Sequence, residues 1–452
     1  MENQEQRPAG CIVLVPCPFQ GHINPMLNLG SILHSKGFSI TIAHAKFNSP
    51  DPANHPDFTF LPIQDGLSNI KASSLNFISI IRAINDNIEL HLPQNLSRMV
   101  TDSDQTLCII YDALMYKAES VAKHLKIPSI IFETSTASLS LVYAQLPGLA
   151  ADGFIPITES VANDMVPGLQ PLRFKDLPIF NFPGYDDLFQ LITSTTDIRS
   201  SSAIIWNTTE CLEQASISKI HEHFQQVSCF AIGPFHKIIP SPSSSLLKEN
   251  SHCITWLDKQ EEKSVIYVSI GSVASMEGGE LIEIAWGLAN SQQPFLWVIR
   301  PGSVCNEEWI SQLPENLKEA VSKERGYVVE WAPQREVLAH AAVGAFWSHC
   351  GWNSTIESIS EGVPLICRPC FGDQRLNARY VSIVWRLGIT LEDDKLERKE
   401  VEQAVRRLMV DEECEELRQR AKDMKKQIEL CIGSNGTSHK SLNDLVAFLV
   451  SL

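Results

Sequence analysis

The chain alternates short apolar runs with helical patterns along most of its length, and this alternation restricts the folds that it can adopt. In the first half, the runs CIVLVPCP (Cys11–Pro18) and FSITIAHA (Phe38–Ala45) flank HINPMLNLGSILHSKG, whose apolar residues recur at helical spacing. Strands that alternate with helices form a parallel sheet with helices on both faces. The first half is therefore predicted to be an α/β domain with a doubly wound sheet.

The same alternation restarts after a break that is rich in proline and serine. The stretch KIIPSPSSSLLKENS has no apolar period, as expected for a surface linker. Beyond it, KSVIYVSIGS, PFLWVIRP, GYVVEWAPQ, VGAFWSHCG and GVPLICRP are predicted strands of a second doubly wound domain. Two such Rossmann-like domains would face each other across a cleft, where open α/β sheets bind their ligands. The expected division is a first domain over 1–237, a linker over 238–254, a second domain over 255–432, and a C-terminal helix over 433–452 that packs on the first domain.

Charge and composition restrict the partners. The 452 residues include 37 Lys+Arg and 53 Asp+Glu, which gives a net charge of -16 and disfavours binding to nucleic acid. The first residues, MENQEQRPAG, lack the pattern of a signal peptide, and no apolar run reaches the roughly 18 residues that cross a bilayer. We therefore expect a cytoplasmic monomer without stable membrane insertion.

The cysteines allow a metal site to be considered. Twelve cysteines are scattered along the chain, which indicates reduced thiols and not a disulfide framework. Cys367 and Cys370 have a metal-like spacing, and His349 and Cys350 lie nearby in the sequence. Because a second pair with such spacing is missing and Cys367 ends an apolar run, a structural cysteine is favoured over a zinc ligand.

The glycines argue against a dinucleotide cofactor, and one loop suggests a phosphate site. Neither opening strand is followed by G-x-G-x-x-G, so NAD is not expected.

The strand VGAFWSHCG leads through Trp-Asn-Ser into a helix, and the free N–H groups of a helix N-terminus suit a phosphate. Ser354 and Glu357 also have the spacing of a capping box, which is the alternative interpretation of these two residues.

A longer segment decides between these interpretations. The 44 residues WAPQREVLAHAAVGAFWSHCGWNSTIESISEGVPLICRPCFGDQ, from Trp331 to Gln374, closely resemble the donor-binding signature of the plant family-1 UDP-dependent glycosyltransferases. The resemblance extends along the chain through PCPFQGHINPML, YDAL, YVSIGS and LNARYV. It implies the two-domain GT-B fold, UDP-glucose as the donor substrate, and no metal or other cofactor.

The resemblance assigns the nucleoside contacts. Trp331 would stack on the uracil, an interaction worth about 1–3 kcal/mol, and the Ala332 backbone would bind the edge of the base. From the sequence alone, Trp331 would be interpreted as a core residue at a strand end. Gln334 and Glu357 match the ribose-binding positions, and a carboxylate such as that of Glu357 can accept from both ribose hydroxyls.

The resemblance also assigns the diphosphate and sugar contacts. Donors around the diphosphate would stabilise the charge of the departing UDP without a metal. At the sugar, Gln374 favours glucose over galactose within the family. The matching positions are Ser272, His349, Asn353 and Ser354 for the diphosphate, and Trp352, Asp373, Gln374 and Thr134 for the sugar.

Two residues of the first half match the catalytic dyad of the family. His22 follows the first strand and Asp112 ends a later one, so both are expected at the carboxyl edge of one parallel sheet. Taken singly, the histidine would be a hydrogen-bonded loop residue and the aspartate a helix cap. By resemblance, His22 is the general base for the acceptor and Asp112 orients its imidazole. Direct attack would invert the anomeric centre and give a β-glucoside.

The acceptor is expected to be a small lipophilic plant metabolite with a hydroxyl or carboxyl group, such as a terpenoid, a phenolic compound or one of their glycosides. A non-catalytic nucleotide-sugar-binding protein of the same fold is the alternative, although retention of the dyad argues against it. A glycoside hydrolase would need two carboxylates flanking the bond, and no motif supplies them. The acceptor-site candidates, most of which are equally interpretable as core, are His22, Gly372, Phe19, Met115, Tyr143 and Leu146.

Overall fold

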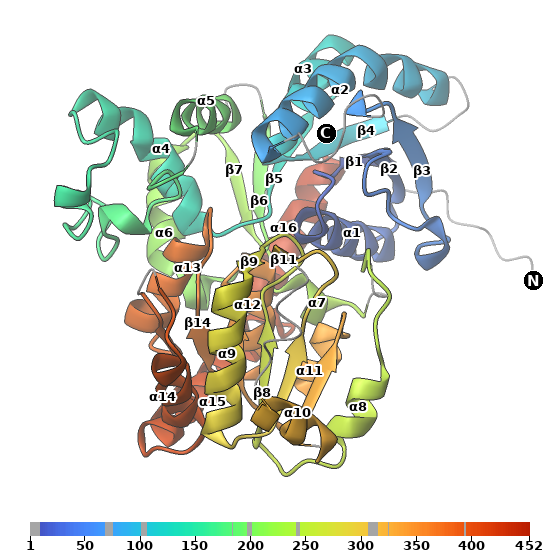
Figure 1. Cartoon of the computed structure of the whole chain (residues 1–452). Coiled ribbons are helices and arrows are strands. Elements are labelled where there is room, and N and C mark those ends of the chain that lie inside the picture. Colours follow the sequence, from blue (N-terminus) through green and yellow to red (C-terminus); the bar gives the residue numbers. More distant parts are fainter. Residues whose placement is uncertain are drawn as a thin grey trace, which may run out of the picture. The chain divides into compact units, whose positions relative to one another are not determined.

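The computed structural model describes residues 10–67, 76–100, 106–182, 184–196, 201–240, 245–305, 315–323, 325–392 and 395–452. The chain forms two compact units, and Figure 1 labels most of their helices and strands. The first unit comprises Met1–Pro156, Asn181–Leu246 and Leu430–Leu452, and the second comprises Ile157–Phe180 and Leu247–Glu429.

The first unit is built on a seven-stranded sheet whose order is β3-β2-β1-β4-β5-β6-β7. Every neighbouring pair is parallel, as the alternation of strands and helices predicts. Chain order reverses between β1 and β4, and such a switch point opens a crevice at the carboxyl ends of the strands. The strands are β1 (Cys11–Val15), β2 (Ser39–Ala45), β3 (Thr59–Ile63), β4 (Thr106–Asp112), β5 (Ser129–Glu133), β6 (Ala203–Trp206) and β7 (Ser228–Ala231).

Helices complete the first unit. The side chains of Ile12 and Leu14 on β1 share a core with Leu442, Leu445 and Leu449 of the last helix, α16 (Thr437–Val450). This amphipathic helix therefore contributes to the hydrophobic core of the first unit. The other helices are α1 (Gln20–Ser35), α2 (Phe77–Val100), α3 (Lys117–Leu125), α4 (Ala137–Ala151), α5 (Tyr185–Thr196), α6 (Glu210–His223) and α7 (Phe235–Ile238).

The second unit has a six-stranded sheet of order β12-β10-β8-β13-β14-β15, again parallel throughout. Its switch point lies between β8 and β13. A separate two-stranded ladder pairs β9 with β11. The strands are β8 (Val265–Ser269), β9 (Met276–Glu277), β10 (Phe295–Val298), β11 (Val304–Cys305), β12 (Gly326–Val329), β13 (Val343–Ser348), β14 (Leu365–Cys367) and β15 (Gly388–Thr390).

The helices of the second unit include two that pack against each other and share its core, α9 (Gly278–Ser291) and α14 (Arg398–Met409). Gly287 of α9 lies so close to Val401 of α14 that an added Cβ would approach within 2.3 Å, so the glycine sets their separation. The remaining helices are α8 (His252–Leu257), α10 (Glu315–Ser322), α11 (Gln334–Ala339), α12 (Trp352–Glu361), α13 (Gln374–Arg379), the π-helical turn Tyr380–Val384, and α15 (Glu413–Ile432).

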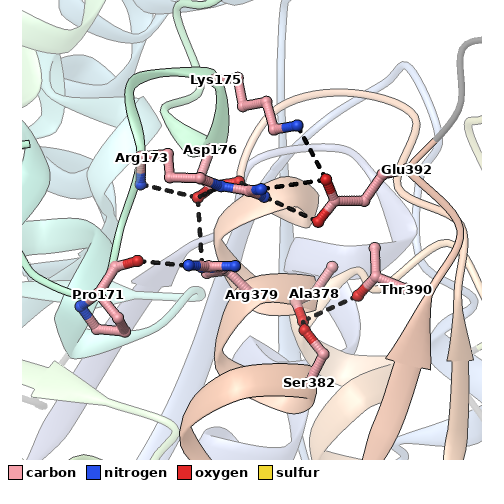
Figure 2. Close-up of polar contacts among 9 residues, drawn as sticks. All are labelled: Pro171, Arg173, Lys175, Asp176, Ala378, Arg379, Ser382, Thr390 and Glu392. Atoms are coloured by element: carbon pink, nitrogen blue, oxygen red, sulfur yellow. Dashed lines mark hydrogen bonds and ion pairs between the residues drawn. The ribbon is translucent and has the colours of Figure 1, made fainter. Parts of the chain in front are cut away.

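A polar network holds Ile157–Phe180 in the second unit, although this segment comes from the first half of the chain (Figure 2). Arg173 donates to both Asp176, at 2.9 Å, and Glu392, at 3.0 Å. Lys175 donates to the other oxygen of Glu392 at 2.9 Å. Burial alone would raise the pKa of Glu392, but the bonds from Arg173 and Lys175 lower it to about 2. The network therefore remains charged throughout the physiological pH range.

The observed units differ from the expected boundaries. The prediction assigned residues 1–237 to one domain, whereas Ile157–Phe180 belongs to the second unit. The expected linker, 238–254, begins within the last turn of α7 and runs into α8, and its residues 241–244 lie outside the described residues. Within the described parts of the chain, none of the helices combines the length and the hydropathy needed to span a membrane.

Candidate active site

The switch point of the first sheet brings His22 and Asp112 together. His22 lies in the first turn of α1, directly after β1, and Asp112 is the last residue of the neighbouring strand β4. His22 Nδ1 lies 2.8 Å from Asp112 Oδ2, and the aspartate side chain is 1% exposed while that of the histidine is 24% exposed. The backbone N–H of Leu114 donates to the other carboxylate oxygen at 3.0 Å. Asp112 is therefore fixed, and its histidine partner faces solvent.

The hydroxyl of Thr134 completes this arrangement. Thr134 follows β5, the next strand in the sheet, and its Oγ1 lies 2.9 Å from His22 Nδ1. When Asp112 is ionised, Nδ1 carries a proton and donates to the carboxylate, which leaves the imidazole lone pair on Nε2. In the neutral form of the imidazole, this geometry turns the basic nitrogen away from Asp112, as a general base requires.

Two further ionisable groups lie beside the dyad, and neither is among the site residues predicted from the sequence. Burial, aided by the nearby Asp112 carboxylate, raises the pKa of the Cys17 thiol well above its usual value. Burial and Asp112 likewise raise the pKa of Glu133 to about 8, although His22 partly opposes the shift. Glu133 could have been found, because it is a carboxyl that ends the apolar run SIIFE beside the strand that ends at Asp112.

The cysteines that were considered as zinc ligands do not form a three-ligand metal group among the described residues. Among the described residues, the group of three or more potential ligands close enough to share a metal is Cys17, His22 and Asp112, whose ligand atoms lie within 4.8 Å of one another. Cys367 and Cys370 form no such group with His349 and Cys350 in the described part of the chain. Cys367 is buried, in agreement with a structural role.

The switch point of the second sheet carries His349 and the turn after β8. The imidazole of His349 packs on two glycines, since a Cβ on Gly271 or on Gly351 would lie 2.5 Å from the ring. Burial lowers the pKa of His349 to about 4, so the ring is neutral at physiological pH. Its Nδ1 is buried without a hydrogen-bond partner among the described residues. His349 can therefore offer a ligand a hydrogen bond, but not a positive charge.

Helix α12 begins earlier than a capping box at Ser354 would require. Its N-cap is Gly351, so Ser354 lies inside the first turn. Cys350, the residue before the N-cap, takes a left-handed φ of 63°. Ser354 Oγ accepts from Gln334 Nε2 at 3.0 Å instead of capping the helix. The capping-box alternative is therefore wrong. The first turn of α12 presents the backbone N–H donors of a helix N-terminus.

Glu357 is held by two donors from the start of α11. Gln334 Nε2 donates to one carboxylate oxygen at 2.8 Å, and Arg335 Nε donates to the other at 3.1 Å. Arg335 is not among the site residues predicted from the sequence. Trp331, which precedes this helix, is partly exposed and is anchored through its carbonyl oxygen, which accepts from the backbone N–H of Asn250 at 2.9 Å. Trp331 as a whole retains accessible surface, whereas neighbouring Ala332 is 3% exposed.

The residues expected at the sugar have structural partners of their own. Gln374 is 4% exposed, and its Oε1 accepts from the backbone N–H groups of Cys370, at 2.8 Å, and Phe371, at 3.0 Å. Asp373 Oδ2 accepts from Asn377 Nδ2 at 2.9 Å. Trp352 is 3% exposed. Some of the hydrogen-bonding atoms of Asp373 and Gln374 are therefore occupied within the protein, and only the others can bind a ligand.

The remaining expected residues divide between the surface and the core. Ser272, Asn353 and Gly372 are partly exposed in the second unit, and Gly372 has a left-handed φ of 65°. In the first unit, Phe19 and Tyr143 are partly exposed, and the ring of Phe19 lies 5.2 Å from that of Phe77. The structure places two acceptor-site candidates, Met115 and Leu146, in the core, where they are 0% and 1% exposed.

Comparison with known proteins identifies the family. The family profile described as UDP-glucoronosyl and UDP-glucosyl transferase matches residues 92–421. The chain belongs to this family of UDP-glycosyltransferases. Among similar UDP-glycosyltransferases, the flavonol 3-O-glucosyltransferase UGT76E12 of Arabidopsis thaliana is 45% identical over 100% of this chain and 99% of its own length. UDP-glycosyltransferase 76H1 of Stevia rebaudiana is 46% identical over 94% of this chain and 100% of its own length.

Solved structures of UDP-glycosyltransferases share the fold. Os79 from O. sativa in complex with UDP is 27% identical, with a TM-score of 0.82 over 97% of this chain and 100% of that one. Phytolacca americana UGT2, solved with UDP-2fluoro-glucose and pterostilbene, is 26% identical, with a TM-score of 0.83 over 97% of this chain and 99% of that one. The prediction of an α/β protein of the GT-B class is confirmed, and so is the prediction of a glycosyltransferase.

Proposed function

We propose that this UDP-glycosyltransferase transfers glucose from UDP-glucose to a hydroxyl or carboxyl of a small lipophilic metabolite, with inversion to a β-glucoside. The observation that carries the proposal is the bond of 2.8 Å between His22 Nδ1 and Asp112 Oδ2. An alcohol is a poor nucleophile until a base removes its proton during attack. A histidine whose tautomer is fixed by a buried carboxylate meets that need.

In the proposed reaction, the acceptor oxygen attacks the anomeric carbon from the face opposite the diphosphate. Its proton passes to His22 Nε2 while the bond between the anomeric carbon and the diphosphate oxygen breaks. Asp112 stabilises the imidazolium that results, and UDP leaves as the anion. An acceptor carboxylate is already ionised at neutral pH, so His22 contributes less to that reaction.

The second unit supplies the donor contacts in this proposal. The first turn of α12 and the neutral imidazole of His349 would donate hydrogen bonds to the diphosphate, together with Ser272, Asn353 and Ser354. The partly exposed Trp331 would stack its indole on the uracil, and Glu357 would accept from the ribose hydroxyls. Because these donors stabilise the leaving group directly, we assign no step to a metal ion.

The names of similar proteins support the substrate classes. One relative is a flavonol 3-O-glucosyltransferase, and one structural neighbour holds UDP-2fluoro-glucose together with pterostilbene. Another was solved with a trichothecene. These acceptors are compact, largely apolar molecules that carry hydroxyl groups. We propose that the acceptor of this chain belongs to the same class, which includes terpenoids, phenolic compounds and their glycosides.

The test is to incubate the purified protein with UDP-glucose or UDP-galactose and a panel of phenolic and terpenoid acceptors, and to detect glycosides by mass spectrometry. We expect glucosides, formed equally well in EDTA. The variant His22→Ala should lower kcat/KM for alcohol acceptors by about 100- to 10,000-fold. Its affinity for UDP, measured by calorimetry, should stay unchanged, because the change lies in the other unit.

A matched control lies on the same helix. His34 of α1 bonds through Nδ1 to the Phe38 carbonyl oxygen, at 3.2 Å, so His34→Ala changes the same residue type outside the dyad. It should retain turnover. Wild-type turnover in His22→Ala would exclude His22 as the base. UDP binding without any glycoside from the wild-type protein would favour the non-catalytic alternative.

A further inference from the structure

Three potential metal ligands meet at the switch point of the first sheet, and the proposed transfer reaction uses only two of them. The ligand atoms of Cys17, His22 and Asp112 lie within 4.8 Å of one another. His22 Nδ1 is the nitrogen that faces Asp112, at 2.8 Å. The Cys17 thiol has no part in the proposed removal of the acceptor proton. The cluster nevertheless brings a sulfur, a nitrogen and an oxygen to one place, and all three are ligands of zinc.

Backbone hydrogen bonds hold the three residues in this arrangement. The N–H of Phe19 donates to the Cys17 carbonyl oxygen at 2.9 Å, and the N–H of His22 donates to the Phe19 carbonyl oxygen at 2.8 Å. The chain turns through these bonds between β1 and α1. The N–H of Leu114 donates to Asp112 Oδ1 at 3.0 Å, while Oδ2 faces His22. Such second bonds to a ligand orient it for a metal.

The separations in the cluster are close to those that a zinc ion requires. A tetrahedral Zn²⁺ lies about 2.3 Å from sulfur and about 2.0–2.2 Å from nitrogen or oxygen, so its ligand atoms are roughly 3.4–3.6 Å apart. The contact between His22 and Asp112 would therefore open by about 0.6 Å. The bond from Thr134 Oγ1 to the same nitrogen, now 2.9 Å long, would be replaced. Since the His22 side chain is 24% exposed, its ring can move and the ion can enter beside it.

The charges of the cluster suit a divalent cation. Cys17 is 0% exposed and Asp112 is 1% exposed, so a bound ion would be largely buried. Burial of a charge is costly unless opposite charges neutralise it. A Cys17 thiolate and the Asp112 carboxylate together cancel the two charges of Zn²⁺. Sulfur and nitrogen ligands also favour zinc over Mg²⁺ and Ca²⁺, which prefer oxygen.

We propose that Cys17, His22 and Asp112 bind Zn²⁺ and that the bound ion inhibits the enzyme. Burial and Asp112 raise the pKa of the Cys17 thiol, so its proton stays until the metal displaces it to water. His22 Nδ1 gives its lone pair to the metal, and the imidazole proton is then carried by Nε2. A protonated Nε2 cannot take the proton of the acceptor hydroxyl. The inhibition rests on the proposed role of His22 as the base, whereas the metal site does not.

Substitution by cobalt tests the metal site without any measurement of activity. The full-length protein is freed of metal with EDTA, transferred to chelator-free buffer with a phosphine reductant, and titrated with Co²⁺. We expect the charge-transfer absorption of a cobalt–thiolate bond, which saturates at one cobalt per chain and disappears when zinc is added. Cys17→Ser should lose this absorption.

A matched control variant lies on the strand that precedes Cys17. Cys11 of β1 is also buried, but its Sγ lies 3.5 Å from Thr41 Oγ1 and it is not a member of the cluster. Cys11→Ser should therefore keep the absorption. If Cys17→Ser does not fold, Cys17→Ala, which places no polar group in the core, provides the same test.

Calorimetric titration with zinc measures the affinity. Loss of an outer-shell partner alone typically weakens metal binding about 10- to 100-fold, so loss of the sulfur ligand in Cys17→Ser should raise the Kd for zinc at least about 100-fold. The inhibition is read from glucoside formation, with each protein compared with its own rate in EDTA. Zinc should inhibit the wild type and Cys11→Ser alike, and Cys17→Ser should need correspondingly more zinc. Mg²⁺ at the same concentration should inhibit none of them.

The two readouts separate the metal site from the proposed catalytic role. A wild-type protein without the thiolate absorption, or an absorption that persists in both Cys17→Ser and Cys17→Ala, would overturn the site. Full turnover by the wild type when zinc saturates the site would overturn the inhibition and, with it, the role of His22 as the base, although the metal site itself would stand.

Discussion

The side-chain carbonyl oxygen of Gln374 accepts a hydrogen bond from the backbone N–H of Cys370, at 2.8 Å. The same oxygen accepts from the N–H of Phe371 at 3.0 Å, so Gln374 closes the loop between β14 and α13. Only the amide NH₂ of Gln374 is then left to donate to the sugar. The residue expected to set donor preference therefore has a structural role as well.

Substitutions at Gln374 should separate these two roles. Gln374→His removes the acceptor of two backbone N–H groups, and we expect it to destabilise the fold by about 1–3 kcal/mol and to lower the use of UDP-glucose relative to UDP-galactose. Gln374→Glu keeps an acceptor oxygen but loses the NH₂, so it should unfold near the wild-type temperature and still lose activity with UDP-glucose. Thermal unfolding and a donor competition assay measure both effects. An unchanged donor ratio in both variants would remove Gln374 from sugar selection.

Glu357 should contribute more to UDP binding than the arginine that holds it. If the carboxylate bonds to ribose, Glu357→Ala removes charged hydrogen bonds worth about 1.5–3 kcal/mol, so the Kd for UDP should rise roughly 10- to 100-fold. The pair with Arg335 is partly exposed, which limits its contribution to about 1 kcal/mol or roughly fivefold for Arg335→Ala. Calorimetric titration with UDP measures both. Equal effects of the two substitutions would contradict a direct role for Glu357.

The contact between Gly271 and His349 predicts a loss of donor binding in Gly271→Ala. The new methyl group would lie 2.5 Å from the imidazole and force it away from its place beside α12. A matched control exists in the same unit, because Gly302 has nearly the same φ, 76° against 78°, but open space around its Cβ. Both variants should lose about 1–2 kcal/mol of stability through backbone strain. Only Gly271→Ala should weaken UDP binding, and equal binding by the two variants would exclude the ring contact as the cause.

Much of this structure follows from patterns that are local in the sequence. The apolar runs at Cys11–Val15 and Val343–Ser348 lie on strands of two parallel sheets, because a strand covered on both faces must be apolar throughout. Both His22 and His349 follow strands that border a switch point, which sequence order alone suggests once the sheets are parallel.

The features that sequence reasoning missed depend on contacts between distant residues. The ion pair between Arg173 and Glu392 helps to hold Ile157–Phe180 in the second unit. No local sequence pattern indicates that Arg173 has a partner 219 residues away. The start of α12 was misplaced because Ser354 and Glu357 have the spacing of a capping box, while their actual partners, Gln334 and Arg335, lie on another helix. Met115 and Leu146 could not be recognised as core residues without the packing around them.

Glu133 should make stability depend on pH in a direction opposite to that of most carboxylates. Burial and Asp112 raise its pKa to about 8 in the folded protein, whereas an unfolded glutamate titrates near about 4.3. Between these values the folded state binds the proton and the unfolded state does not, so the stabilising effect of the protonated group is complete below about pH 4 and is lost as pH rises to about 8.

The variant Glu133→Gln stays neutral at every pH and therefore lacks this dependence. Relative to that variant, the free energy of unfolding of the wild-type protein should fall by up to ~1.4 kcal/mol per pH unit within this window. The decrease is smaller to the extent that solvent reaches the carboxyl. Denaturant unfolding of both proteins from pH 5 to 9 measures the difference, and a constant difference would show that Glu133 is ionised in both states. Because a pKa of about 8 keeps Glu133 largely protonated at pH 7 in the folded protein, Glu133→Gln should also retain turnover there. This result would separate Glu133 from the Asp112 carboxylate, which the proposed mechanism requires to be charged.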